Sequence, residues 1–257
     1  MAKRTIKRDA LVAFLNEYLQ ISTVQDDAWN GLQVEGSDTI GKVFFAVDAG
    51  METFQQAKKH NAHMVVVHHG MFWQNSKPCL VGSKRDQCEF LLKEGISLYA
   101  AHLPLDKHPE VGNNAQLLKL LGYEVERPFC KYHGQDISFI GKSGKPKSID
   151  SIVEILRNQL GAECKVLHFG KKTIQRIAVC SGGGANYGIM QEAFDAGVDL
   201  YLTGDATEMY HVAKDNKFNI IFAGHHATET VGVRALSKLV AKKYGIETLF
   251  FDIPTHL

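Results

Sequence analysis

The feature that most constrains the fold is an internal repeat of strand and helix signals. The stretch from Lys42, KVFFAVDAGMETFQQAKKHNAHMVVVHHG, predicts a strand, a helix and a second strand. The stretch from Arg176, RIAVCSGGGANYGIMQEAFDAGVDLYLTGD, predicts the same order. Continuous β-branched runs such as residues 64–67 are typical of parallel strands that are buried on both faces. Each stretch is therefore predicted to form a βαβ unit.

The likeness continues beyond these two stretches. Each is followed by a further helix and strand signal, in EFLLKEGISLYAAHLPLD and in HVAKDNKFNIIFAGHHATE. An alignment without gaps places His102 against His225 and Asp106 against Glu229. Both copies then enter another helix and a last strand, in NNAQLLKLLGYEV and in VGVRALSKLVAKKYGIETLFF. The same order of elements in both copies predicts an internal duplication, so the expected fold class is α/β, with two similar α/β domains.

The two copies also set the expected domain boundary. Residues 1–127 are predicted to form the first α/β domain and residues 128–257 the second, with C-terminal elements that pack on the first domain or swap with it. The segment between the copies contains glycines and a proline, so it is expected to begin as a loop and a short strand. It then continues into a capped helix, SIDSIVEILRNQL, that starts near Ser148 or Asp150.

Composition argues against several roles. Lys and Arg total 29 and Asp and Glu total 28, a balance that gives no support for binding nucleic acid or an anionic membrane. No apolar run reaches the roughly 18 residues of a membrane span. The basic start MAKRTIKRDALVAFLNEYL predicts an amphipathic helix rather than a signal peptide, so a cytoplasmic location is expected. The five cysteines form no C-x-x-C pair, which favours reduced thiols over a disulfide framework.

Histidines and carboxylates gather where predicted strands end. In open α/β sheets, ligands bind beyond the carboxyl ends of the strands. If the two domains face each other across a cleft, side chains at matching strand ends converge there. The residues concerned are His68, His69, His102, Asp106, Asp205, His225, His226 and Glu229.

Five of these side chains are the predicted ligands of two divalent metal ions: His68, His69, Asp106, His225 and Glu229. Imidazole and carboxylate together suit Fe, Zn, Mn, Co or Ni. Five ligands exceed what one tetrahedral ion needs. Adjacent histidines at a strand end are expected to point to different sides, so that one pair serves two ions. A carboxylate that bridges ions roughly 3.5–4 Å apart is a common arrangement for activating water.

The remaining polar residues have alternative interpretations. His102 and His226 either transfer protons as catalytic residues or orient the ligands through hydrogen bonds. Asp205 is a ligand, a general base or, as the favoured interpretation, the cap of a helix in ATEMYHVAK.

Two further motifs also have alternative interpretations. The glycines of SGGGANYG, at Gly182, Gly183 and Gly184, either bind a substrate phosphate or form a tight turn that brings backbone close to the site. NGLQVEG is expected to be a loop, preceded by Trp29 as a core anchor or an interface residue.

Taken together, these motifs resemble the GTP cyclohydrolase 1 type 2 homologue family, also called Nif-three-like. The motifs NGLQVEG, VVVHHGMFW, AHLPLDKHPEVGNNAQL, SGGGANY, DLYLTGD and AGHHATETVGVRAL stand in the family's order, and the resemblance covers about residues 11–254. It implies two α/β domains with a metal site in the cleft between them. It also implies a toroidal homohexamer whose metal sites face an inner cavity.

The resemblance also implies roles for the five ligands. His68 and His225 would serve one ion, His69 and Asp106 the other, and Glu229 would bridge both. The family name implies a metal-dependent hydrolase that opens the purine ring of a GTP-like nucleotide. The alternative is a metal carrier or a regulatory scaffold without turnover. A third interpretation, a ring that encircles nucleic acid, is disfavoured by the net charge of +1.

Overall fold

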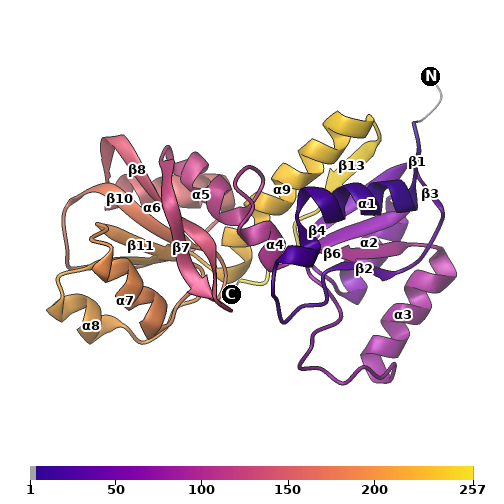
Figure 1. Cartoon of the computed structure of the whole chain (residues 1–257), viewed down its shortest axis with the longest axis horizontal. Coiled ribbons are helices and arrows are strands. Elements are labelled where there is room, and N and C mark those ends of the chain that lie inside the picture. Colours follow the sequence, from indigo (N-terminus) through magenta and orange to yellow (C-terminus); the bar gives the residue numbers. More distant parts are fainter. Residues whose placement is uncertain (1–3, 257) are drawn as a thin grey trace. The chain divides into compact units, whose positions relative to one another are not determined.

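The computed structural model describes residues 4–256 and has a mixed α/β architecture (Figure 1). The chain divides into two compact units. The first runs up to Leu105 and also includes Val233–Ile253; the second comprises Asp106–Gly232 and the residues from Pro254 onward. Each unit has its own sheet and its own hydrophobic core, which is what an independent folding unit requires.

The first unit contains a five-stranded sheet of order β13-β4-β5-β6-β2. Strands β13, β4, β5 and β6 are parallel, and β2 closes the edge in the antiparallel direction. A short antiparallel pair, β1 with β3, forms a separate two-stranded sheet. The elements are β1 (Ile6–Lys7), α1 (Arg8–Tyr18), the 3-10 turn η1 (Ile21–Thr23), β2 (Gly31–Val34), β3 (Thr39–Ile40), β4 (Lys42–Asp48), α2 (Met51–Lys59), β5 (Met64–His69), α3 (Gly82–Glu94), β6 (Ser97–Ala100) and β13 (Glu247–Phe250).

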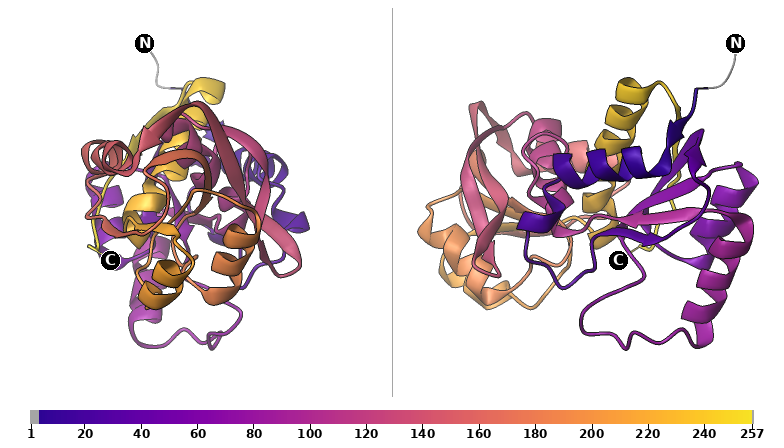
Figure 2. Two further views of the ribbon diagram at one scale, coloured as in Figure 1. Left: turned by 90° about the vertical axis from the view of Figure 1, so that its left-hand side faces the viewer. Right: turned by 45° about the vertical axis from the view of Figure 1, so that its right-hand side comes forward.

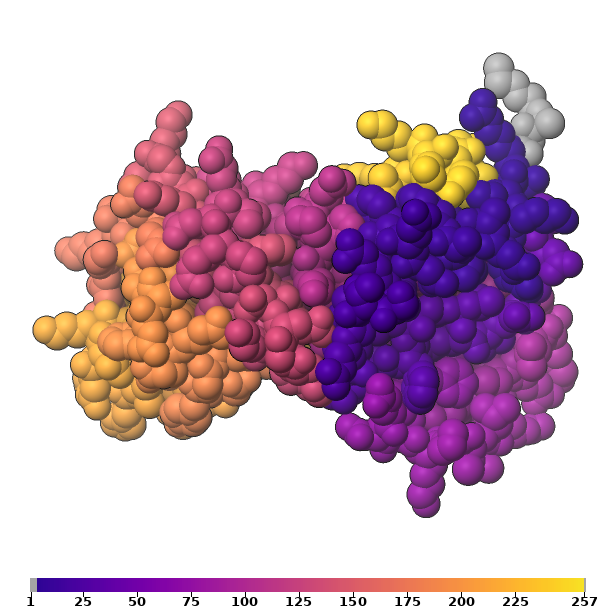
Figure 3. Space-filling model, viewed as in Figure 1, coloured from indigo at the N-terminus to yellow at the C-terminus, as the bar shows by residue number. Residues whose placement is uncertain are grey.

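Hydrophobic periodicity explains the elements of this unit. In α1, Leu11 and Leu15 are four residues apart, lie on one helical face and are both fully buried. The valines of β5 are buried on both faces, as the sequence predicted for a parallel strand. The C-terminal residues of the unit, yellow in the space-filling view, lie against the indigo N-terminal ones (Figure 3). Pairing of β13 with β4 fixes this arrangement.

The second unit contains a six-stranded sheet of order β7-β8-β10-β11-β12-β9. Strands β10, β11 and β12 are parallel, whereas β8 and β9 flank them in the antiparallel direction. The elements are α5 (Asn113–Leu121), β7 (Glu124–Tyr132), β8 (Gln135–Ser148), α6 (Ile149–Leu160), β9 (Lys165–His168), β10 (Thr173–Cys180), α7 (Tyr187–Asp195), β11 (Leu200–Thr203), α8 (Tyr210–Asp215) and β12 (Asn219–Phe222). Two helices contain residues of both units: α4 (Leu103–Asp106) and α9 (His225–Tyr244).

The two sheets share an order of elements. Each has three successive parallel strands joined by helices, β4-β5-β6 in one and β10-β11-β12 in the other. Each also has an antiparallel edge strand, β2 or β9, that follows a helix and pairs with the third parallel strand. The sheets differ next to the first parallel strand, where one has β13 and the other has β8. The shared order is consistent with the predicted duplication, which stays a prediction.

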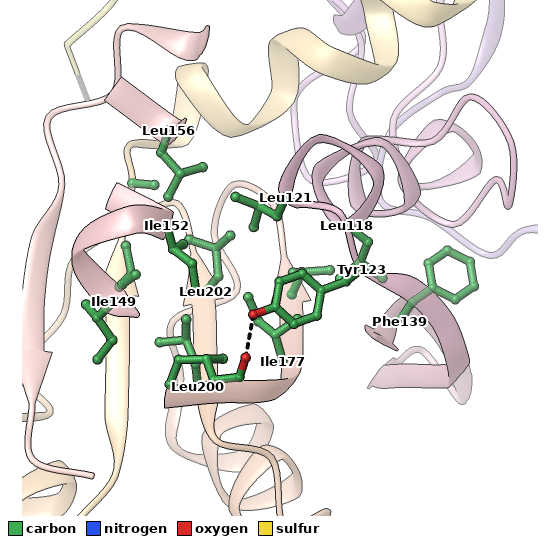
Figure 4. Close-up of a cluster of buried hydrophobic side chains, with 14 of the residues drawn as sticks. Leu118, Leu121, Tyr123, Phe139, Ile149, Ile152, Leu156, Ile177, Leu200 and Leu202 are labelled. Atoms are coloured by element: carbon green, nitrogen blue, oxygen red, sulfur yellow. Dashed lines mark hydrogen bonds between the residues drawn. The ribbon is translucent and has the colours of Figure 1, made fainter. Parts of the chain in front are cut away.

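The core of the second unit lies between α5, α6 and the sheet (Figure 4). Leucine and isoleucine side chains from both helices point toward those of β10 and β11 in the close-up. The ring of Tyr123 joins this cluster while its hydroxyl donates a hydrogen bond of 2.8 Å to the carbonyl of Ile174. A buried phenol is tolerated because its polar group has an acceptor.

The division of the chain differs from the boundary predicted at residues 127 and 128. That boundary would cut β7, which pairs with β8 along its length, and α5 packs on β8 and β10 of the same sheet. The segment after Pro128 is not a loop with a short strand but a long hairpin, because Gly141 and Gly144 lie inside β8. At Gly141 a Cβ would come within 2.6 Å of Leu118, so this glycine allows close packing of α5.

Two further expectations are corrected. NGLQVEG does not form a loop, because Gly31–Val34 forms β2 and pairs with β6. The last long helix, yellow in Figure 2, does not begin after HHATE but at His225 itself. Because they are four residues apart in this helix, His225 and Glu229 lie one helical turn apart. The helix in SIDSIVEILRNQL is confirmed, and the Ser148 side chain caps it by accepting a hydrogen bond from the Ser151 amide. In residues 4–256, no helix has the length and apolar character that a membrane crossing requires.

Replacing Leu156 in α6 by alanine should lower the free energy of unfolding by about 2–5 kcal/mol, because this side chain is fully buried and its loss leaves a cavity. Leu92→Ala in α3 is the matched control, since Leu92 is 60% exposed and should change stability by less than about 0.5 kcal/mol. Urea unfolding of the full chain measures both, and equal losses would contradict the assignment of Leu156 to a core.

Candidate metal centre

Four histidines near strand ends share one hydrogen-bonding pattern. In each, the ring nitrogen Nδ1 faces an acceptor oxygen. Neutral imidazole carries one proton, so a proton held on Nδ1 leaves the lone pair on Nε2. Metal-ligating histidines characteristically have this second hydrogen bond, which fixes tautomer and ring orientation. The pairs are His68 with Ala101 O at 2.9 Å, His69 with Asp48 Oδ1 at 2.7 Å, His102 with Asp26 Oδ1 at 2.9 Å and His225 with Asp205 Oδ1 at 2.9 Å.

In the first unit, β5 presents His68 and His69 at its carboxyl end. They do not point to opposite sides, as a regular strand end would require, because their ring centroids lie 4.7 Å apart. Each ring is tied to a different neighbouring strand, His69 to Asp48 at the end of β4 and His68 to the Ala101 carbonyl after β6. The two imidazoles therefore converge beyond the strand end.

His102 completes this group. One ring nitrogen from each of His68, His69 and His102 lies within 4.8 Å of the others. The Trp73 ring meets His102 edge to face at 5.0 Å, and the Asn30 side chain accepts a hydrogen bond of 2.7 Å from the His102 amide. Three imidazoles at this spacing form a set of donors for a transition metal ion.

Asp26 fixes the position of His102. Its carboxylate also accepts hydrogen bonds from the Ala28 and Leu103 amides and from the Asn30 side chain. Burial alone would raise the pKa of the Asp26 carboxyl, but the hydrogen bonds from His102, Ala28 and Asn30 outweigh it and lower the pKa to about 2. The residue is therefore an anion at neutral pH and keeps a proton on Nδ1 of His102.

In the second unit, α9 presents His225 and Glu229. They are four residues apart on one helical face, and His225 Nε2 lies 3.2 Å from Glu229 Oε1. Glu229 is only 2% exposed, and a buried carboxylate is costly unless it is paired or coordinates a metal. A histidine and a carboxylate so placed are two donors for one ion.

The glycine turn after β10 makes room for these donors. Gly182 has φ +60°, and a Cβ there would come within 2.1 Å of Glu229 Oε1 and 3.0 Å of His225 Nε2. Gly184 lies beside other residues. A Cβ built on it would come within 2.6 Å of Cys180 Sγ, and the Gly184 carbonyl accepts a hydrogen bond from the Tyr201 hydroxyl. The tight-turn interpretation thus accounts for Gly182 and Gly184. Asp205 Oδ2 is the nearest atom to a Cβ built on Gly183, at 3.5 Å.

Asp106 belongs to the second unit, where its carboxylate is held by Asn113 and Ser181. It is 5% exposed, and its Oδ1 accepts hydrogen bonds from Asn113 Nδ2 at 2.8 Å and from Ser181 Oγ at 2.9 Å. Asn114 ties this loop to the turn by accepting a hydrogen bond from the Ser181 amide. Both of these hydrogen bonds end on Oδ1 and hold this oxygen in place.

Some sequence interpretations need correction. Asp205 does not cap the helix of ATEMYHVAK, because α8 begins at Tyr210 after Met209; it orients His225 instead. Trp29 is 59% exposed and is not a core anchor. His226 is buried at the first turn of α9.

Some residues that position the donors could not be predicted from the sequence. Asp48 lies at a strand end, so the rule that indicated His68 could also have indicated Asp48. No sequence pattern indicated Asp26, Asn113 or Asn114, because their roles depend on hydrogen bonds that form only in the folded chain.

The residues present therefore fit a divalent metal ion. In the first unit, three imidazoles offer ring nitrogens within 4.8 Å of one another. In the second unit, His225 Nε2 lies 3.2 Å from the buried carboxylate of Glu229. Imidazole with carboxylate suits Zn and other first-row transition metals. Together, the fold and these donors define an α/β protein with a candidate metal centre.

Comparison with known proteins identifies the family. Residues 6–256 match the model of Duf34/NIF3 (NGG1p interacting factor 3), and the chain belongs to this family. A protein of Pyrococcus horikoshii named GTP cyclohydrolase 1 type 2 homolog is 47% identical and aligns over 97% of this chain and 99% of its own. A Pseudomonas aeruginosa protein of the same name is 42% identical over 97% of this chain and 98% of its own.

Solved structures show the same fold. The structure of protein ybgI, described as of unknown function, superposes with a TM-score of 0.90 at 36% identity, covering 98% of this chain and 100% of that one. TTHA1606 from Thermus thermophilus gives a TM-score of 0.87 at 34% identity, with 98% and 100% covered. Reduced HcgD from Methanocaldococcus jannaschii, at 21% identity, shares the fold with a TM-score of 0.82.

Replacing Asp26 by asparagine should loosen the tautomer of His102, because an amide cannot accept all of the hydrogen bonds that the carboxylate accepts. Nitrogen NMR of histidine-labelled protein should show the His102 proton shifting from Nδ1 toward Nε2. Asp48→Asn is the matched control and should move only the His69 signals. Unchanged His102 signals in Asp26→Asn would contradict the role given to Asp26.

Proposed function

We propose that this protein holds two divalent metal ions and uses them to hydrolyse a nucleotide-like substrate. The observation that carries the proposal is the shared hydrogen bond at Nδ1 of His68, His69 and His225, which directs the lone pair of each ring to Nε2. Each of the three rings therefore offers an unprotonated Nε2, which is the form of imidazole that binds a metal ion.

The ligand assignment follows the resemblance to the family. His68 and His225 would serve one ion, His69 and Asp106 the other, and Glu229 would bridge both. Two features of the chain support the central place of Glu229. Its carboxylate is almost fully buried, and a Cβ at Gly182 would collide with its Oε1, so the glycine leaves room for this carboxylate. A negative charge in such a position is stabilised by cations on more than one side.

Bound divalent ions would supply a water molecule with a lowered pKa, able to attack near neutral pH. The chain itself would hold and move protons. His102 is not a metal ligand in this assignment. Asp26 fixes its Nδ1 proton, so Nε2 is the atom that would accept a proton from water or pass it to a leaving group. His226, buried at the start of α9, is the second candidate for proton transfer.

The proposed substrate class rests on the names of relatives and on the glycine turn. Proteins at 47% and 42% identity are named GTP cyclohydrolase 1 type 2 homolog. A purine nucleotide would be attacked at C8, which opens the imidazole ring. Gly182 and Gly183 would leave room for a phosphate beside the metal-binding residues; the Gly184 carbonyl is already hydrogen-bonded to Tyr201.

Substitution of single ligands should separate the two ions. Glu229→Ala should lower the content of both metal ions, because one carboxylate is assigned to both. Asp106→Ala should mainly remove one. His60→Ala is the control and should remove neither, since the His60 ring packs against Phe44 and Phe251. Elemental analysis of metal per folded chain measures this, and equal losses in the first two variants would contradict the bridging assignment.

A turnover assay tests the hydrolase itself. Metal-loaded protein should convert GTP or a related nucleotide to a ring-opened product that chromatography with mass detection resolves, and His102→Asn should slow this by about 10²–10⁴-fold. Metal binding without turnover on any nucleotide would reject the hydrolase. Ready transfer of metal to an acceptor chelator would then favour the carrier.

A further inference from the structure

Two buried cysteines of the second unit lie in contact. The Sγ atoms of Cys130 and Cys180 are 3.2 Å apart, and the residues are 0% and 3% exposed. Both are free thiols, as are the other three cysteines. A disulfide has an S–S distance of about 2.05 Å, so a closure of roughly 1 Å would join the pair.

The backbone of Cys130 is unusual for a strand residue. Its φ is +65°, a left-handed value that costs energy for any residue with a Cβ. The turn is held by Glu192, whose carboxylate accepts hydrogen bonds from the amides of Cys130 at 3.2 Å and Lys131 at 3.1 Å. Cys130 lies in β7, an edge strand of the sheet. In this conformation its thiol contacts the Cys180 thiol and is not exposed to solvent.

Cys180 connects this contact to the candidate metal centre. It is the last residue of β10 and immediately precedes Ser181. Ser181 Oγ donates to Asp106 Oδ1, and the Ser181 amide donates to Asn114. A displacement of Cys180 is therefore passed through one peptide bond to the group that orients the Asp106 carboxylate.

We propose that Cys130 and Cys180 are a redox modification site: a hydroperoxide converts them to a disulfide, and this bond displaces Ser181 and so reorients Asp106. The disulfide part stands without any metal, whereas the effect on metal affinity rests on the proposed function. The edge position of β7 permits the closure, because this strand is hydrogen-bonded to β8 alone within its sheet.

The chemistry balances with one peroxide molecule. The sulfur of Cys180, the more exposed of the two, forms an S–O bond as the O–O bond breaks, and one water leaves. The Cys130 sulfur then attacks this sulfenic acid, the S–S bond forms, the S–O bond breaks and a second water leaves. Two thiols lose two electrons and two protons in total, and a dithiol reductant reverses the step.

The protonation state of Cys130 sets the order in which the two thiols react. The contact with Cys180 and burial raise the pKa of the Cys130 thiol above its ordinary value, so Cys130 is a neutral thiol near pH 7. Direct oxidation of Cys130 is therefore slow, which leaves it available to resolve a sulfenic acid on Cys180.

The first experiment maps the bond. Full-length Cys79→Ser protein, which lacks the exposed thiol, is treated with hydrogen peroxide, alkylated in denaturant and digested without reductant. The expected product is a peptide containing Cys130 linked to one containing Cys180, lost on treatment with dithiothreitol. Adding Cys164→Ser should leave the link intact, and adding Cys130→Ser or, separately, Cys130→Ala should abolish it. Recovery of both thiols fully alkylated would overturn the proposal.

The second experiment measures the coupling. Cobalt titration of reduced and oxidised Cys79→Ser protein, followed by absorbance, should show one of two ions bound about tenfold more weakly after oxidation. The difference should vanish in the Asp106→Ala background. A mapped disulfide with identical cobalt affinities would overturn the coupling to Asp106. Failure of the reduced protein to bind cobalt at all would reject the proposed function while the disulfide result still decides the modification site.

Discussion

The candidate centre depends on hydrogen bonds that hold a proton on Nδ1 of its histidines. Without an acceptor at Nδ1, a neutral imidazole exchanges between two tautomers, and the lone pair needed by a metal ion is present on Nε2 only part of the time. Here a backbone carbonyl or a carboxylate removes that freedom at His68, His69, His102 and His225. At Asp26 the pKa falls to about 2 despite burial, so this acceptor is charged at neutral pH.

The architecture supplies those acceptors at the ends of parallel strands. In the first unit, the order β4-β5-β6 places Asp48 and Ala101 on either side of the two histidines that end β5. In the second unit, the turns after β10 and β11 bring Gly182 and Asp205 to the first turns of α9. Parallel strands end at one edge of a sheet, so their loops can be specialised while the buried valines and isoleucines behind them maintain the sheet.

Much of the fold could be predicted because it rests on local patterns. The β-branched run of β5 and the leucine spacing of α1 each specify one element, and the repeat of such elements indicated two α/β units. The hairpin β7-β8 could not be found this way, since Gly141 is set by the approach of Leu118 from α5 rather than by a turn. The same holds for the site: strand ends indicated the histidines, whereas Asp26 reaches His102 across 76 positions of sequence.

A crystal structure of the zinc-loaded full chain, with anomalous scattering recorded at the zinc edge, tests the central claim most directly. We expect two anomalous peaks per chain, with His68, His69 and His225 each bonded through Nε2 at about 2.0–2.1 Å. Their Nδ1 atoms should still be hydrogen-bonded to Ala101, Asp48 and Asp205. Zinc bound through Nδ1, or no peak beside these rings in protein that retains its fold, would contradict it.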